Sequence, residues 1–195
     1  MTTQPGRPAH KSWRLFIAAP MPDAAAKEVW HALAAVRSRH PDARWLPPQK
    51  LHLTLVFLGQ TESRDIDRIA AATAAVAARH EAYPVATGDG GGRVDTTRGG
   101  VAWLRLADGG HETAQLALDL DVEIGSGSYD PAHPPHPHLT VARGVDQPTL
   151  DDIRATGDGM SLRWTIDRLV LFRSYTDPHG SIYEELSTHL LAEPG

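Results

Sequence analysis

The chain of 195 residues contains no cysteine. That absence excludes disulfides, thiolate nucleophiles and cysteine-ligated zinc, and it fits a reducing, cytoplasmic setting. Long hydrophobic runs are also missing, because the apolar stretch 51–58 is too short to cross a bilayer and is interrupted by His52 and Thr54. Positive charge is scarce, since 19 Lys and Arg stand against 24 Asp and Glu for a formal net charge of −5. A non-specific binder of long duplexes usually carries the opposite sign, whereas a local basic pocket for one phosphate remains compatible with this composition.

The residues that are present suit one folded domain made of two small lobes, because 41% of them are hydrophobic and can form a core. We expect 1–11 to form a flexible N-terminal tail, 12–190 the single bilobal domain and 191–195 a C-terminal tail. Six glycines between 88 and 100 predict a flexible loop or hairpin tip. Apolar and helical patterns predict strands at 13–19, 51–58, 84–87, 100–107, 138–143, 162–173 and 181–188, and helices at 23–39, 62–79, 111–122 and 148–155.

A His-aliphatic-Thr-aliphatic motif occurs twice, as HLTL at 52–55 and as HLTV at 138–141. The bare His-x-Thr triplet is weak evidence, because this composition yields roughly 0.85 of them by chance. Two copies with aliphatic residues at both flanking positions have a chance probability on the order of 10⁻³. The copies are 138 − 52 = 86 residues apart, and the predicted strands 13–19 and 100–107 recur at a similar offset. We interpret this recurrence as an internal duplication.

The spacing within the motif predicts a shared face. In a strand, residues i and i+2 point to one side and the residues between them to the other. His52 and Thr54 therefore share a face, as do His138 and Thr140, while the aliphatic positions point into a core. Imidazole gains and loses a proton near neutral pH, so one ring can accept a proton from water while the other donates one to a leaving alkoxide. Threonine hydroxyls can donate to phosphate oxygens. The residues alone do not assign the acid and the base.

These motifs and their context resemble the 2H phosphoesterase superfamily, which is named for two His-x-Thr-x motifs. Within it the chain is similar to the RNA 2′,3′-cyclic phosphodiesterases, also called 2′-5′ RNA ligases (the LigT or ThpR family). The resemblance runs from Arg14 to Leu186. Besides the two motifs, it is carried by RLFIA at 14–18, RWLPP at 44–48, FLG at 57–59, PHLTVAR at 137–143, LFRS at 171–174 and YEEL at 183–186.

The resemblance implies an α+β bilobal fold with two pseudo-symmetric lobes, each an antiparallel sheet with helices on the outside, and an active cleft between them. It implies hydrolysis of a 2′,3′-cyclic phosphate at an RNA end to a 2′-phosphate, with no metal or cofactor and with 2′-5′ ligation as the reverse reaction. The expected protein is a cytoplasmic monomer. By position, His52 takes the proton-donor role and His138 the proton-acceptor role, while Thr54 and Thr140 bind the phosphate. Arg143 is implied at the phosphate too, although strict alternation would place it on the face opposite His138.

Other residues are weaker candidates. Trp45 and Tyr175 can stack a terminal base, and Lys50 can steer an anion, with ordinary packing or solvation as the competing interpretation. We expect Phe57 in the core, because it stands at an odd position of its strand. The stretch 133–138 (HPPHPH) brings three histidines close in sequence, which allows a metal site, although its prolines favour a solvated loop.

Two other functions remain open from the sequence. A 2H enzyme acting on a small nucleotide, such as ADP-ribose 1″,2″-cyclic phosphate or a 2′-5′ oligoadenylate, would use the same histidines. A non-catalytic protein that binds RNA ends would keep the fold without the reaction. Intact histidine and threonine in both motifs argue against the second alternative.

Overall fold

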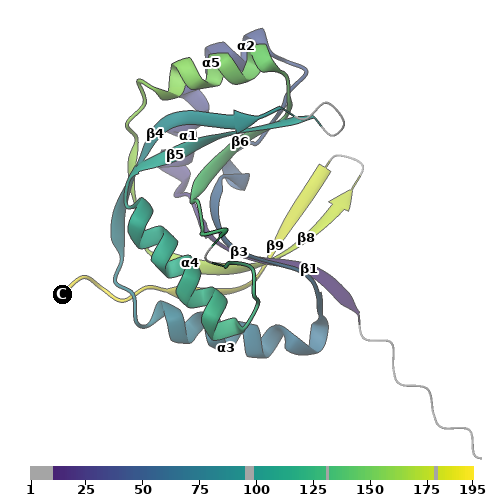
Figure 1. Ribbon diagram of the computed structural model, residues 1–195, viewed down its shortest axis with the longest axis vertical. Helices are drawn as coiled ribbons and strands as arrows, with labels where there is room; N and C mark the ends of the chain where they lie inside the picture. Colours follow the sequence, from purple (N-terminus) through teal and green to yellow (C-terminus); the bar gives the residue numbers. More distant parts are fainter. Residues whose placement is uncertain (1–10, 95–98, 131, 178–179) are drawn as a thin grey trace, which may run out of the picture.

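The computed structural model describes residues 11–94, 99–130, 132–177 and 180–195, which form one curled antiparallel sheet of nine strands with helices on its outside (Figure 1). The strands are β1 (Ser12–Pro20), β2 (Arg44–Trp45), β3 (His52–Glu62), β4 (Tyr83–Arg93), β5 (Gly100–Asp108), β6 (His138–Val145), β7 (Arg163–Ile166), β8 (Arg168–Asp177) and β9 (Gly180–Leu190). The helices are α1 (Asp23–Ala32), α2 (Ala34–Arg39), α3 (Ile66–Ala77), α4 (Gly110–Ile124) and α5 (Gln147–Gly157), with short 3-10 turns η1 (Pro48–Lys50) and η2 (Ser63–Asp65).

The two motif strands, β3 and β6, lie side by side at the centre of the sheet. The strand order is β7-β4-β5-β6-β3-β1-β8-β9, and β2 pairs with β6. Within the described residues, β3 and β6 are joined by the antiparallel pair Leu53 and Leu139. Three further strands continue outward on each side of this pair, so the two halves are related by an approximate two-fold axis. The predicted α+β fold with two pseudo-symmetric lobes is confirmed, with the two expected sheets joined into one.

Helices from one half of the chain pack against strands and helices of the other half. α1 and α2 follow β1 but lie with α5 beside β4, β5 and β6, whereas α4 follows β5 but lies with α3 beside β3 (Figure 1). A histidine–aspartate pair ties each of these helix layers together. His40 Nε2 lies 2.8 Å from Asp152 Oδ2 between α2 and α5, and His80 Nε2 lies 2.9 Å from Asp119 Oδ2 between α3 and α4. The two halves therefore interlock.

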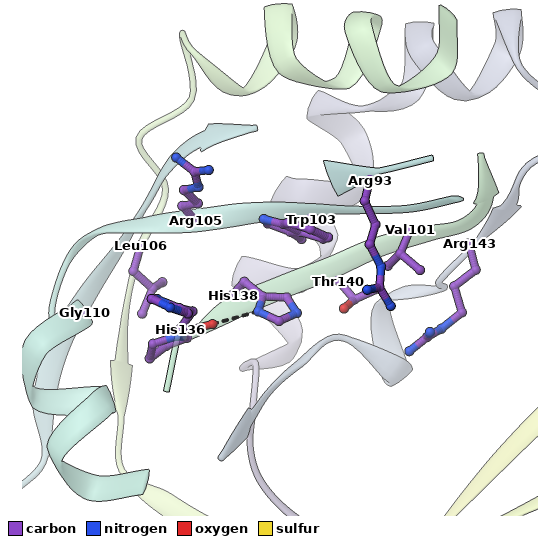
Figure 2. Close-up of a pocket in the computed structure, with 11 residues that line it drawn as sticks. Arg93, Val101, Trp103, Arg105, Leu106, Gly110, His136, His138, Thr140 and Arg143 are labelled. Carbon is purple, nitrogen blue, oxygen red and sulfur yellow. Dashed lines mark hydrogen bonds between the residues drawn. The ribbon is translucent and has the colours of Figure 1, made fainter. Parts of the chain in front are cut away.

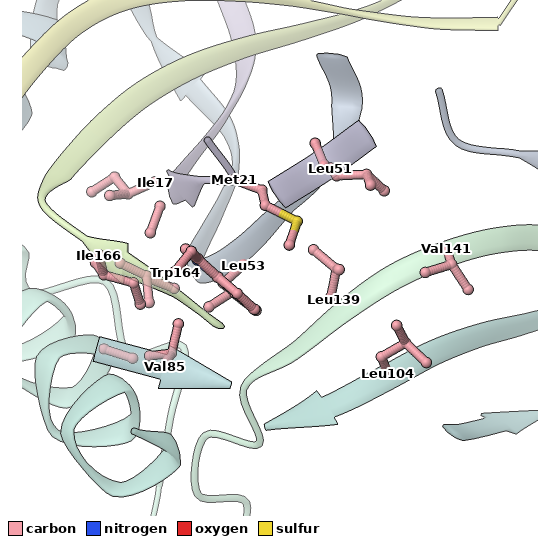
Figure 3. Packing of buried hydrophobic residues seen from close by; sticks show 14 of the residues in the cluster. Ile17, Met21, Leu51, Leu53, Val85, Leu104, Leu139, Val141, Trp164 and Ile166 are labelled. Atoms are coloured by element: carbon pink, nitrogen blue, oxygen red, sulfur yellow. The ribbon is translucent and has the colours of Figure 1, made fainter. Parts of the chain in front are cut away.

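The aliphatic residues of both motifs are buried in one core. Leu53 and Leu139 are 1% and 0% exposed, and they pack in the same cluster as Leu104 of β5 and Ile17 of β1 (Figure 3). Fully burying a leucine side chain stabilises a fold by about 1.5–3 kcal/mol, so this cluster holds the motif strands firmly in place. Since neighbours in a strand point to opposite faces, the same packing turns the histidine and threonine of each motif to the open face of the sheet.

The glycine-rich segment lies in the antiparallel hairpin of β4 and β5 and is mostly strand, so of the two predicted alternatives the loop over 88–100 is wrong and the hairpin agrees with the structure. Residues 88–93 belong to β4, and 95–98 lie outside the described residues. A Cβ on Gly90 would meet the Arg154 backbone of α5 at 2.7 Å, and one on Gly91 would meet Trp103 Nε1 at 2.5 Å. These glycines allow a helix and an indole ring to approach the strand backbone closely, a use of glycine that composition alone does not reveal.

Two predicted elements are divided in the structure, and one observed strand was not predicted. The predicted strand 162–173 is interrupted at Asp167 and forms β7 and β8, and the predicted helix 23–39 is divided at Leu33 into α1 and α2. The short strand β2 has no counterpart among the predicted elements. No helix within the described ranges is long and apolar enough to span a membrane.

The predicted C-terminal tail begins later than residue 191. Leu191 is 6% exposed within the core, and the Ala192 N–H donates to the His80 carbonyl oxygen at 2.8 Å. The packed region therefore continues for two residues beyond the end of β9. Residues 1–10 of the predicted N-terminal tail lie outside the described part of the chain.

Candidate active site

Each motif strand carries a bulge directly after its threonine. The pairing of β3 with β1 skips Leu55, and the pairing of β6 with β5 skips Val141, which is the equivalent position of the second motif. Both bulged carbonyl groups are satisfied by the other half of the chain. The Tyr129 hydroxyl donates to the Leu55 carbonyl oxygen, and the Leu46 N–H donates to the Val141 carbonyl oxygen at 2.9 Å. These contacts make the bulges built-in features of both strands.

The bulges reverse the alternation of side chains, which corrects the prediction for Phe57 and reconciles Arg143 with the place that the resemblance implied. Phe57 and Arg143 stand three residues after Thr54 and Thr140, where strict alternation would point them away from the motif face. The extra residue in each strand returns both side chains to that face. Phe57, expected in the core, is 46% exposed, and Arg143 lines the cleft as the resemblance implied.

The pairing of the motif strands brings the four motif side chains together. In an antiparallel ladder, the residue before one member of a pair lies across from the residue after the other. The pair Leu53–Leu139 therefore places His52 across from Thr140 and His138 across from Thr54. Two imidazoles and two hydroxyls thus share one face at the centre of the sheet.

The open face is hollowed into two adjoining pockets that share Arg143. The larger, of about 900 Å³, contains His138 and Thr140 (Figure 2). The smaller, of about 500 Å³, lies on the side of His52 and is lined by Tyr183, whose ring meets the His52 ring edge-on at 5.4 Å between centroids. Two pockets that meet at Arg143 therefore lie where the resemblance implied a cleft, and His138 and Thr140 line the larger one. His52 and Thr54 line neither pocket, and His52 adjoins the smaller one through Tyr183.

Both motif histidines are oriented by the same hydrogen bond. His52 Nδ1 donates to the Lys50 carbonyl oxygen at 2.8 Å, and His138 Nδ1 donates to the His136 carbonyl oxygen at 2.8 Å (Figure 2). A carbonyl oxygen can only accept, so the proton of each neutral ring sits on Nδ1. Nε2 of each ring is then the atom that exchanges a proton at the open face.

Aromatic rings enclose His52. Phe16 of β1 lies 5.2 Å from the imidazole between centroids, and Tyr183 of β9 closes another side. His52 Nε2 also accepts a hydrogen bond from the Thr54 hydroxyl at 3.0 Å in the neutral ring. These contacts fix the ring while leaving Nε2 engaged with its own motif threonine.

This environment keeps His52 neutral in the free protein. Burial lowers the pKa of His52 from 6.5 to about 4. The hydrogen bond to the Lys50 carbonyl opposes this shift in pKa, and electrostatic interactions with Arg143 and His138 add to it.

His138 stands in a different setting. Its ring lies 5.1 Å from the Trp103 ring between centroids, at an interplanar angle of 47°. Trp103 belongs to β5, and arginines of β4, β5 and β6 line the same pocket (Figure 2). His138 is therefore surrounded by one indole ring and several arginines, whereas His52 is surrounded by uncharged aromatic rings.

The weaker candidates separate into two groups. Lys50 and Trp45 line the smaller pocket, with Lys50 Nζ donating to the Ser181 carbonyl at 2.7 Å and Trp45 Nε1 donating to the His40 carbonyl at 3.0 Å. Tyr175 is not brought to the cleft. It is 43% exposed and neighbours Thr176, the residue of β8 that does line the smaller pocket, so the alternation of the strand directs Tyr175 away.

The histidine-rich stretch before the second motif does not gather as a metal-binding cluster. His133 Nδ1 lies 3.2 Å from Asp130 Oδ1, and His138 is bound to the main chain. Among the described residues no group of three or more histidine and carboxylate side chains is placed to hold a metal ion. His136 instead lines the larger pocket.

Sequence reasoning missed the aromatic and basic residues of the partner strands. Trp103, Arg105 and Arg93 line the larger pocket, and Tyr183 lines the smaller one. The usable signal was the alternation of 101, 103 and 105 within a predicted strand. Placing that strand beside His138 required the strand order, which the sequence does not contain.

Comparisons with known proteins agree with this geometry. The sequence pattern of the 2′-5′ RNA ligase superfamily matches residues 21–178. A Thermus thermophilus protein named RNA 2′,3′-cyclic phosphodiesterase is 28% identical over 185 residues, covering 89% of this chain and 87% of the relative. A crystal structure of a Thermus thermophilus protein shares the fold at a TM-score of 0.73 and 24% identity, covering 93% of this chain and 100% of that one. Escherichia coli LigT in its apo form gives a TM-score of 0.70 at 21% identity, covering 94% and 99%.

Proposed function

The chain belongs to the 2′-5′ RNA ligase superfamily, and from this premise we propose that it is a phosphodiesterase that hydrolyses the terminal 2′,3′-cyclic phosphate of RNA to a 2′-phosphate. The observation that carries the proposal is the arrangement of the two motifs. Both pairs of histidine and threonine face one open surface, and both imidazoles present Nε2 to it. The name of the Thermus thermophilus relative supports the cyclic phosphate as substrate.

The proposed reaction uses the histidines on opposite sides of the phosphorus. His138 Nε2 takes a proton from water while the water oxygen forms a bond to phosphorus. The bond from phosphorus to the 3′-oxygen breaks, and His52 Nε2 gives its proton to that oxygen. The product carries a 2′-phosphate and a 3′-hydroxyl. Each proton transfer contributes roughly 10²–10⁴ in rate.

The donor role of His52 follows from the resemblance and needs a charged imidazole. Since the free protein holds the pKa of His52 at about 4, the substrate must supply part of the stabilisation. A cyclic phosphate carries one negative charge, and an anion beside an imidazole favours its protonated form. We therefore expect His52 to take up a proton as the substrate binds.

Thr54, Thr140 and Arg143 are proposed to hold the phosphate. Each threonine hydroxyl can donate to a non-bridging oxygen, where charge increases in the transition state. Arg143 adds a permanent positive charge and a planar pair of donors suited to phosphate. Its place between the two pockets puts it within reach of an anion bound from either side.

The test is turnover of a nucleoside 2′,3′-cyclic monophosphate and of a defined RNA with a cyclic phosphate end, in excess EDTA. Wild-type protein is expected to release only the 2′-phosphate. His52→Ala and His138→Ala are each expected to lower kcat by at least about 10², with circular dichroism confirming that both variants are folded. His133→Ala is the matched control, because this exposed histidine contacts Asp130 and belongs to neither motif.

Three outcomes would contradict the proposal. Binding of the RNA end without turnover would indicate a non-catalytic protein, and loss of turnover in EDTA would indicate a metal-dependent reaction. Release of a 3′-phosphate would overturn the assigned leaving group. A monomeric state, a cytoplasmic location and 2′-5′ ligation by reversal stay predictions from the sequence.

A further inference from the structure

The larger pocket extends beyond what one cyclic phosphate requires. It continues from His138 along β5 and β4, past Trp103, toward Arg93 at one end and Arg105 at the other (Figure 2). Its volume of about 900 Å³ lies near the upper end of the range usual for small-ligand sites. This part of the pocket has no role in the proton transfers assigned to the two histidines.

Trp103 forms a fixed wall of this space. The indole ring lies against the bare backbone of Gly91, where an added Cβ would meet Nε1 at 2.5 Å and the ring carbons Cδ1 and Cε2 at 3.2 Å. The ring is only half-buried and faces the pocket beside His138. A tryptophan held on one side and open on the other is the kind of surface on which nucleobases stack.

The charges in this pocket have one sign. Arg93, Arg105 and Arg143 line it, and none of its lining residues within the described part of the chain is acidic. This local excess of cations occurs in a protein whose formal net charge is −5. Arg105 contacts Asp89 through a surface ion pair of 3.3 Å, with both side chains more than half exposed, which is too weak to withhold the guanidinium from a phosphate.

Building on the proposed function, we propose that the Trp103 pocket binds the nucleotide that precedes the cyclic phosphate end. In an RNA strand the terminal ribose is joined through its 5′-oxygen to one further phosphate and one further base. With the cyclic phosphate between His52 and His138, the preceding base stacks on Trp103, and the linking phosphate contacts the guanidinium of Arg105. The substrate class is therefore an RNA end of two or more nucleotides, and a mononucleotide leaves this pocket unused.

The measurement is kcat/KM for a dinucleotide with a 2′,3′-cyclic phosphate relative to that for the matching mononucleotide. We expect wild-type protein to prefer the dinucleotide by at least about tenfold, since stacking one base on an aromatic ring gives an effect of that order. Trp103→Ala is expected to remove most of this preference, and Trp103→Phe to retain part of it. Arg105→Gln, a change at an exposed position that does not threaten folding, is expected to lower the ratio about fivefold or more and to weaken its dependence on salt.

Asp89→Asn is the matched control, because it breaks the same ion pair as Arg105→Gln while leaving the cation in place. Its dinucleotide ratio is expected to stay within about twofold of wild type, since exposed ion pairs contribute little. The inference is overturned if wild type shows no dinucleotide preference, if Arg105→Gln leaves the ratio unchanged, or if Asp89→Asn lowers it equally. Failure of the proposed function gives a different result, namely no turnover of either substrate by wild type.

Discussion

The two motif strands share a backbone plan and differ in what surrounds it. His52 and His138 each bind the carbonyl group two residues earlier through Nδ1, and each strand bulges at the residue after its threonine. Around the first histidine the neighbours are Phe16 and other aromatic rings, whereas Trp103 and arginines accompany the second. The backbone around the two histidines is thus related by an approximate two-fold axis, while the side chains that surround them differ.

The partner strands show how the difference arises. β1 places Ala18 opposite Thr54, and β5 places Trp103 opposite Thr140. A small residue on the first side leaves room for rings from β8 and β9, while the indole on the second side opens toward a basic pocket. The proposed mechanism needs one proton donor and one proton acceptor at the same moment, and unlike surroundings are a way to give two identical side chains different roles.

The largest expected consequence concerns acid stability and comes from His52. Its pKa is about 4 in the folded protein and 6.5 in the reference state, so the unfolded chain binds more protons between these values. Stability is therefore lost as pH falls from 6.5 through 4, by up to about 3 kcal/mol. The His52→Gln variant lacks the titrating group and so avoids this loss. The difference in free energy of unfolding, variant minus wild type, should therefore increase by that amount as the pH is lowered from about 8 to about 4.

Urea unfolding across this pH range measures the effect. The difference between variant and wild type at about pH 8, where His52 is neutral in both states, gives the part that does not depend on protons. A difference that stays constant down to about pH 4 would show that the two histidine environments do not differ as described.

The second comparison uses the equivalent positions after the two bulges. Arg143→Ala is expected to lower kcat/KM about 100-fold, because it removes charged hydrogen bonds to the phosphate. Phe57→Ala, at the matching position of β3, is expected to change kcat/KM by less than about threefold. Steady-state kinetics with one cyclic nucleotide measures both, and Arg143→Lys should recover part of the loss. Equal losses of kcat/KM in Arg143→Ala and Phe57→Ala would contradict the inference that only the second of these equivalent positions contacts the phosphate.

A smaller effect is expected at the threonines. Thr54→Val and Thr140→Val each remove one hydroxyl donor while keeping a β-branched side chain, so kcat should fall about tenfold in each. Thr54 also donates to His52 Nε2 at 3.0 Å, a bond that Thr140 does not make to its own histidine within the described contacts. The pH profile of kcat should therefore change in Thr54→Val more than in Thr140→Val. Identical pH profiles in the two variants would show that the hydrogen bond from Thr54 to His52 has no effect on catalysis.

The smallest expected effect is a difference in thermal stability between substitutions in the two helix layers. Asp152 of α5 contacts both Arg39 and His40, and these hydrogen bonds lower the pKa of its carboxyl group. Asp119 of α4 contacts His80. Asp152→Asn should lower Tm more than Asp119→Asn, each by less than about 3 °C, since exposed ion pairs contribute little. Calorimetry at neutral pH gives both values, and the reverse order would contradict the comparison.

The sequence predicts the centre of this site better than its edges. The spacing of His52 and Thr54, with aliphatic residues between and after them, is sufficient to place both side chains on one face, because that inference needs only the period of a strand. The helices and most strands follow from the same kind of local pattern. The internal duplication stays a prediction, although the two-fold strand order agrees with it.

The remaining features depend on contacts that no local pattern encodes. A bulge depends on the pairing of two distant strands. Simple alternation therefore puts Phe57 in the core, which is wrong, and would put Arg143 on the face opposite the one that the resemblance implied. Gly90 and Gly91 indicate a loop by composition, but they serve a close approach of α5 and Trp103. The sequence offers Tyr175 as an aromatic ring that can stack a base, but the alternation of β8 directs it away from the pocket.

A titration of the protein with inorganic phosphate, followed by NMR of the histidine rings, tests whether both imidazoles act on one anion. We expect the Nε2 resonances of His52 and His138 to shift together with a single phosphate affinity, and the pKa of His52 to rise from about 4 as phosphate binds. If only one ring responds, or if the two respond with different affinities, the histidines do not share a phosphate and the two-histidine mechanism is wrong.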